Sequence, residues 1–346
     1  MKVVSIVFLI LFGLVPCVVM AEVQHAMDAK TFSFYLENDV FAGTDRHYTS
    51  GVRLTWISPD LTHFREHQPL PDWSQPLIKR LPFINKPGFQ HAVYLSIGQK
   101  ICTPEDIKRS DLIEEDRPYA GLAYLAIGFQ SKNNRRMETL EFDVGIIGPH
   151  SYAEDVQTEL HEWIDSPVPS GWDNQLDDEL VVAVVYTHKI KLIQSGLGNG
   201  FNYDFIPHVG GGLGNLKTYT NAGAQFRIGW NLPNDFGTFL IRPGSECNVP
   251  IDERDPRFFP RYHRFGVHVF TALDLSAILY DIFLDGNTFK ESHSVDKEFF
   301  TANIMAGFSL IVGRFKMSYA YVYQTKEFIN QQKENVFGTI TICFTY

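Results

Sequence analysis

Residues 336–346 read VFGTITICFTY, and this stretch decides the fold class. Its side chains alternate in kind: Val336, Gly338, Ile340, Ile342, Phe344 and Tyr346 take one parity, and Thr339, Thr341, Cys343 and Thr345 take the other. Because the side chains of a strand point alternately to opposite faces, one face is apolar and the other is mostly small and polar. The expected strand runs to an aromatic last residue, which is typical of bacterial outer-membrane barrels. A soluble β-sandwich is the alternative class.

The same alternation recurs through the chain. Residues 140–146 place Glu141 and Asp143 on one face and apolar side chains on the other, and residues 315–324 repeat the pattern. Lipid outside and a polar lumen inside require this arrangement. The sequence therefore predicts an all-β transmembrane antiparallel β-barrel of about twelve strands, an even number that such barrels favour. The expected spans are 31–38, 48–58, 91–100, 119–131, 136–147, 179–194, 202–214, 217–230, 263–279, 297–311, 313–325 and 336–346.

The lengths of the connections predict the topology. If the amino end lies in the periplasm, the short turns at 132–135, at 195–201 and around Val312-Gly313 all lie on the periplasmic side. Two long, Pro-rich connections, 59–90 and 231–262, do not fit this rule. Either they fold over the mouth of the barrel, or the strand count is wrong there.

The amino end predicts export. Lys2 precedes an uncharged apolar run that Gly13 and Pro16 interrupt, which favours a signal peptide cleaved after Ala21 over a membrane anchor. The mature barrel domain would then be residues 22–346. The net charge of −10 argues against nucleic acid as a partner, since binding to phosphates needs a basic surface. Cys102, Cys247 and Cys343 are odd in number and fit no zinc spacing.

Three polar segments follow the first, third and fifth expected strands, so all three lie at the outer rim. The first comprises Glu37-Asn38-Asp39 and residues 44–51, and its oxygen-rich side chains suit calcium, although a polar hairpin loop is the simpler interpretation. The second comprises residues 103–109 and 116–119. A Lys or Arg there would stabilise an oxyanion or hold a phosphate, and a solvated loop is the alternative.

The third segment follows Gly148-Pro149. Ser151 and Glu154 form the spacing of a capping box, which predicts a short helix in this extracellular loop. Gln157 and His161 are four residues apart and therefore share one face of that helix. A histidine on the inner side of a helix outside the barrel wall would serve as a general base, and a surface histidine is the alternative.

Taken together, these segments resemble the lipid A 3′-O-deacylase family of outer-membrane enzymes. The matching stretches are residues 37–39, 44–51, 116–121, 148–149, 157, 161, 171–175, 207–211, 213–215, 232–233 and 235–237. They extend over most of the mature chain. Where the founding enzymes of the family have an acidic residue shortly after the histidine, this chain reads Ser166-Pro167-Val168-Pro169, so either Asp165 or Glu162 replaces it or the role is missing.

The resemblance implies a twelve-stranded barrel with a calcium-dependent esterase site between the wall and a helix. Its implied residues are Asp39 as the Ca2+ ligand, Asn38 supporting the metal or the oxyanion, Thr49 lining the site, His161 as the base, Gln157 beside it, and Lys108, preferred over Arg109, as the site lysine. The implied activity is hydrolysis of the 3′-position acyl ester of lipid A at the outer leaflet of the outer membrane.

Two other functions stay open. A phospholipid esterase would use the same chemistry on another substrate, and a non-enzymatic channel or structural barrel would not need His161 at all. The expected surroundings are lipopolysaccharide and outer-membrane lipids, with no protein partner.

Overall fold

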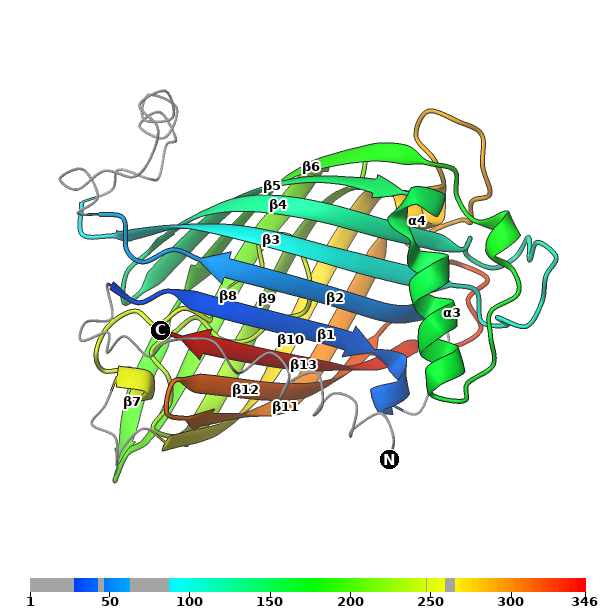
Figure 1. Cartoon of the computed structure of the whole chain (residues 1–346). Helices are drawn as coiled ribbons and strands as arrows, with labels where there is room; N and C mark the ends of the chain where they lie inside the picture. The colour runs from blue at the N-terminus through cyan, green and yellow to red at the C-terminus, as the bar shows by residue number, and fades with distance from the viewer. Residues whose placement is uncertain (1–27, 43–46, 63–86, 247, 259–264) are drawn as a thin grey trace.

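The computed structural model describes residues 28–42, 47–62, 87–246, 248–258 and 265–346 (Figure 1). The expected signal peptide, residues 1–21, lies outside these ranges, and its cleavage stays a prediction. The strands are β1 (Thr31–Asn38), β2 (His47–Ile57), β3 (Gln90–Thr103), β4 (Ala120–Lys132), β5 (Arg136–Ile147), β6 (Glu179–Ile190), β7 (Ile193–Gly198), β8 (Phe201–Gly214), β9 (Lys217–Trp230), β10 (Phe265–Asp281), β11 (Phe300–Val312), β12 (Phe315–Gln324) and β13 (Asn335–Thr345).

The strands close into an antiparallel barrel. Each strand pairs with its neighbour in sequence, β1 pairs with β13 from Thr31↔Thr345 to Asn38↔Gly338, and β6 pairs with β8 to complete the ring. Strand β7 starts three residues after β6 ends and pairs with the same neighbour, β8, so the two act as one strand. The barrel is therefore twelve-stranded, which confirms the predicted class and strand count.

The expected turn at 195–201 is wrong in its bounds. Strand β7 runs on to Gly198, and the chain reverses at Asn199 and Gly200, whose φ angles are 52° and 82°. Two successive positive φ angles at an Asn-Gly pair are typical of a type I′ hairpin turn. The break in the strand falls instead at Lys191, whose N–H donates to the carbonyl of Arg135 at 2.8 Å.

The two faces of the wall differ as the alternation predicts. In β5, Glu141 and Asp143 are buried in the lumen, whereas Phe142 and Val144 are 39% and 45% exposed on the outside. In β13, the threonines and Cys343 point inward in the same way. Among the described residues, no helix is long and apolar enough to cross a membrane.

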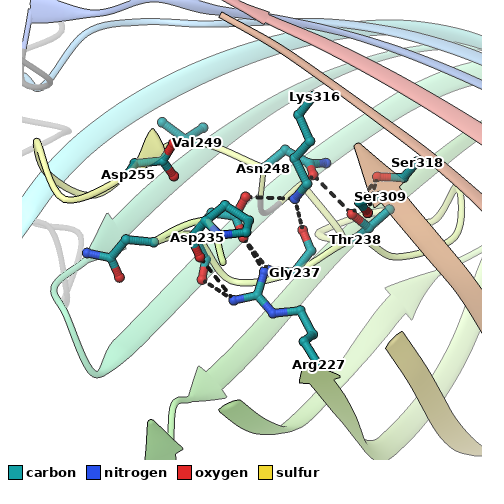
Figure 2. Close-up of polar contacts among 12 residues, drawn as sticks. Arg227, Asp235, Gly237, Thr238, Asn248, Val249, Asp255, Ser309, Lys316 and Ser318 are labelled. Atoms are coloured by element: carbon teal, nitrogen blue, oxygen red, sulfur yellow. Dashed lines mark hydrogen bonds and ion pairs between the residues drawn. The ribbon is translucent and has the colours of Figure 1, made fainter. Parts of the chain in front are cut away.

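The lumen is filled by the connection between β9 and β10, which we call the plug (residues 231–258). At its centre the Asp235 carboxylate accepts hydrogen bonds from Arg227 (2.5 Å) and Lys316 (2.7 Å), as Figure 2 shows. It accepts a third from Arg257, at 3.1 Å. None of these four side chains is exposed. A buried charge is tolerated only when it is paired in this way. For the described part of the connection 231–262, which is residues 231–246 and 248–258, the strand count is right, and the segment folds into the barrel instead of over its mouth.

The plug reaches almost to the outer rim. The Ile241 N–H donates to the Glu37 carboxylate at 2.6 Å, and Glu37 is the last inward-facing residue of β1. Closer to the periplasmic end, the Lys132 ammonium donates to the carbonyl of Pro250 at 2.9 Å. The other long connection, 59–90, lies largely outside the described residues.

Among the described residues, helices are few and lie mostly at the outer end. They are α3 (Ala153–Trp163), the single-turn α4 (Ile282–Asp285), and the 3-10 turns η2 (Asp39–Ala42), η3 (Pro149–Ser151), η4 (Trp172–Asn174) and η5 (Pro256–Phe258). Figure 1 shows α3 lying across the outside of the wall, transverse to the strands.

The expected capping box is wrong. The Ser151 hydroxyl turns back to the carbonyl of Gly148 at 2.6 Å, and the residue before the helix is Tyr152, with φ 56° and no side-chain cap. The single left-handed residue Tyr152 separates η3 from α3, and the helix begins after it, at Ala153.

Candidate active site

Helix α3 is held tightly against the wall at one point, Gly121 of β4. A Cβ atom at Gly121 would lie 2.1 Å from the Ala153 Cβ and 2.3 Å from the Ser151 Oγ, so only glycine allows this approach. The Gln99 amide of β3 adds a hydrogen bond to the carbonyl of Ser151 at 2.8 Å. The start of the helix is thereby positioned by two neighbouring strands.

A tryptophan holds the middle of the helix through Gln157. The buried Trp172 indole donates to the Gln157 Oε1 at 3.0 Å and packs on the Tyr119 ring, with 5.0 Å between the centroids. Tyr119 donates in turn to the carbonyl of Ile107 at 3.2 Å. The Trp172 indole therefore connects the helix with Tyr119, the residue before β4, and Tyr119 connects it with the loop after β3.

The predicted face of the helix is confirmed as a buried one. Gln157 and His161 are 1% and 4% exposed and lie on the side of α3 that contacts β3 and β4. Their catalytic roles stay predictions, but the interpretation of His161 as an exposed surface histidine does not fit.

The surroundings of His161 determine its tautomer. Its Nδ1 lies 2.7 Å from the carbonyl oxygen of Pro167. Because a carbonyl oxygen only accepts hydrogen bonds, Nδ1 carries the proton, and in the neutral ring Nε2 is left as an acceptor. A histidine in this state can take a proton from water.

The Pro167 carbonyl orients the imidazole ring, and it lies in the stretch after His161 where the founding enzymes of the family have an acidic residue. Glu162 is exposed, and Asp165 is exposed with a φ of 56°, whereas Pro167 contacts the imidazole directly. A backbone carbonyl has no signature in the sequence, so only the structure could identify it.

The Gln157 amide is oriented in the same way. Indole N–H groups only donate, so the amide oxygen must face Trp172 and the Nε2 group must point the other way. That Nε2 is buried and has no hydrogen-bond partner among the described residues. A buried donor without a partner costs free energy, and an incoming oxygen atom would recover it.

Asn38 and Asp39 lie where β1 ends and η2 begins. The Asn38 Oδ1 accepts the Val40 N–H at 2.9 Å, which turns the chain, and Asp39 is 1% exposed. The turn packs on β13, where Gly338 leaves room for the Phe41 side chain. In Figure 1 the C-terminal end of α3, which carries His161, lies toward this corner of the wall.

The other predicted site residues are on β2 and on the loop after β3. Lys108 is exposed on the loop after β3, and its N–H donates to Asp106 at 3.1 Å. Arg109 is paired with Asp111 at 3.0 Å, whereas no ion pair of Lys108 occurs in the described part of the chain. Thr49 belongs to β2, at an irregularity between Tyr48 and Ser50, but its side chain lies outside what the structure describes.

The donor set fits calcium in kind. The carboxylate of Asp39 and nearby amide and carbonyl oxygens are the ligands that this ion prefers. No group of three or more His, Cys, Asp or Glu side chains able to hold a metal occurs among the described residues.

A closed antiparallel barrel with an apolar outside and a charged, plugged lumen defines an integral outer-membrane protein. The family model for the outer membrane protein LpxR matches residues 6–346. The chain therefore belongs to the LpxR family, and the expected resemblance is confirmed.

One solved structure supports the fold. LpxR from Salmonella typhimurium matches with a TM-score of 0.69 and 18% identity, over 91% of this chain and 99% of that one. The β domain of the Bordetella autotransporter BrkA reaches a TM-score of only 0.42 at 9% identity, over 92% of this chain and 97% of that one. No curated protein matches the sequence.

Proposed function

We propose that this protein is a calcium-dependent esterase that removes the 3′-position acyl chain of lipid A at the outer leaflet. The observation that carries the proposal is His161, buried between helix and wall with Nδ1 held by the Pro167 carbonyl and Nε2 left to act as a base. Membership of the LpxR family supports lipid A as the substrate.

In the proposed reaction, His161 Nε2 takes a proton from water while the water oxygen bonds to the ester carbonyl carbon. The Gln157 Nε2 group donates to the oxygen that becomes negative. When the bond between the carbonyl carbon and the sugar oxygen breaks, the imidazolium returns the proton to that oxygen. The products are a fatty acid and a free hydroxyl group. A general base typically contributes about 10²–10⁴-fold to the rate.

Calcium held by Asp39, with Asn38 in support, would polarise the ester carbonyl. Thr49 would line the site. Lys108 would contribute its positive charge near the lipid A phosphates or the oxyanion, from a loop that is tied to the site through Ile107 and Tyr119.

The test is the mass of lipid A from a Gram-negative host that expresses the chain. We expect loss of the 3′-linked acyl group with the wild-type protein and none with His161→Ala or Asp39→Asn. His150→Ala is the matched control, because His150 is an exposed histidine paired with Asp178 away from the helix face. If His161→Ala kept full activity in a folded barrel, the assigned base would be wrong.

The alternatives predict other outcomes. Unchanged lipid A together with fatty acids released from phospholipids would indicate a phospholipid esterase. A channel is disfavoured by the plug, whose buried ion pairs occupy the lumen.

A further inference from the structure

Helix α3 has three sides of different character. Its buried side carries Ala153, Gln157 and His161. Successive residues of an α-helix are about 100° apart, so the remaining residues divide into two flanks. One flank is apolar and consists of Tyr152, Val156, Leu160 and Trp163; the other is acidic and carries Glu154 and Glu162, while Asp155 and Glu159 lie between the two flanks, on the side that faces away from the wall.

The apolar flank is exposed. Tyr152 is 62% exposed, Val156 44% and Trp163 57%. In a helix surrounded by water, three large apolar side chains on one flank would be unfavourable. A helix that lies in a membrane interface has this division into an apolar and a charged flank.

The direction of the helix determines where each flank points. The helix starts against Gly121 of β4 and crosses the wall toward β1, with its axis transverse to the strands (Figure 1). Because the helix is right-handed, the flank of Val156 and Trp163 then points along the wall toward the middle of the barrel. The acidic flank points away from the membrane, toward the outer loops.

The wall next to the apolar flank is itself apolar. On β3, Leu95 and Ile97 are 51% and 55% exposed, and on β4, Leu125 and Ile127 are 56% and 40% exposed. These residues belong to the lipid-facing surface of the barrel. The apolar flank of α3 therefore continues a surface that hydrocarbon already covers.

We propose that α3 is an interfacial helix whose apolar flank lies in the acyl region of the outer leaflet, with Tyr152 and Trp163 at the level of the headgroups. Aromatic side chains of this kind gather at that depth in membrane proteins. The occupant of the flank is the hydrocarbon of outer-leaflet lipids. This inference goes beyond the proposed function, because it places the entrance to the His161 side of the helix within the membrane rather than in water.

The direct test is the fluorescence of Trp163 in vesicles of phosphatidylcholine with brominated acyl chains. Subtracting the Trp163→Phe spectrum from that of the wild-type protein isolates this indole from the other tryptophans. We expect strong quenching by bromine near the upper part of the chains and little quenching by aqueous iodide. The matched control is Glu162→Trp in the Trp163→Phe background, one position along on the acidic flank, where iodide should quench and bromine should not.

The opposite result, with Trp163 quenched by iodide and not by brominated lipid, would overturn the proposal and indicate a flank that faces water or awaits a protein partner. This readout needs no enzymatic activity, so it stands apart from the proposed reaction. A second readout joins the two: Trp163→Glu should slow hydrolysis of substrate in bilayers at least tenfold, and leave hydrolysis of a short-chain ester dispersed in detergent within about twofold. Equal loss on both substrates would contradict the proposed role of the flank at the membrane.

Discussion

The contact between Gly121 and helix α3 leads to a prediction that can be worked from the coordinates. In Gly121→Ala, the new Cβ would lie 2.1 Å from the Ala153 Cβ and 2.3 Å from the Ser151 Oγ. Carbon atoms in van der Waals contact are about 3.5–4.0 Å apart. The start of the helix must therefore retreat from the wall by about 1.4 Å or more.

This retreat should affect activity far more than folding. Overpacking of one methyl group costs about 1–3 kcal/mol, which a barrel of this size tolerates. A misplacement of about 1 Å in a group that positions the reaction can cost about 10²-fold in rate. His161 lies two turns further along the same helix, so we expect Gly121→Ala to lower the rate of deacylation about a hundredfold while the barrel stays folded.

The assay is fatty-acid release from purified lipopolysaccharide, with heat-modifiable gel mobility as the measure of folding. Gly196→Ala is the control, because its new Cβ would lie 3.2 Å from the Asn202 Oδ1 and 3.9 Å from the Phe201 carbonyl oxygen, at the periplasmic hairpin. Full activity in Gly121→Ala would refute the reasoning, since it would show that the distance between helix and wall does not set the position of the base.

Three further predictions concern the plug and the site lysine. Asp235→Asn leaves three buried cations without their shared partner, so the free energy of unfolding by urea should fall by about 3–5 kcal/mol, whereas the exposed control Asp111→Asn should change it by less than about 1 kcal/mol. Burial opposes ionisation of Asp235, but the three cations outweigh it and hold the pKa of this carboxyl below its ordinary value. A lowered pKa means that the stabilisation is fully present above the unfolded pKa of about 3.9 and is lost only below it. The difference in the free energy of unfolding between wild type and Asp235→Asn should therefore stay constant from about pH 7 to pH 4.5. A difference that shrinks within that window would contradict a lowered pKa for Asp235. Lys108→Ala should lower the rate of deacylation about tenfold, more than Arg109→Ala, because Arg109 is already paired with Asp111; the reverse order would transfer the role to Arg109.

The parts that alternation determines could be predicted from the sequence. Residues 140–146 and 336–346 lie with the apolar parity outward, because a barrel has no other way to separate lipid from lumen, and Phe337 is an apolar exception that is buried inside. The shared face of Gln157 and His161 followed from helical spacing in the same way.

The plug could not be predicted, because Asp235 and Arg257 have the composition of a solvated loop until their partners on the strands are known. The capping box failed because Ser151 had a local alternative, a hydrogen bond to the carbonyl of Gly148. The Pro167 carbonyl is only six residues from His161, but a backbone acceptor has no signature in the sequence. The donor role of Trp172 depends on how the chain returns to Gln157, 15 residues earlier. The Asn-Gly turn at 199–200 was readable from its two residues and was missed.

The barrel wall is only one residue thick, and this gives the end of β1 an unusual position. Glu37 faces the lumen and holds the plug, whereas the next residue, Asn38, takes the outward parity and leads into Asp39. The plug therefore contacts the last inward-facing residue of β1, two residues before Asp39, the proposed metal ligand at the start of η2. Substitutions that no lipid ever meets, such as those around Ile241, should then appear among the loss-of-activity variants of a random screen, and a search guided by distance from the substrate alone would overlook them.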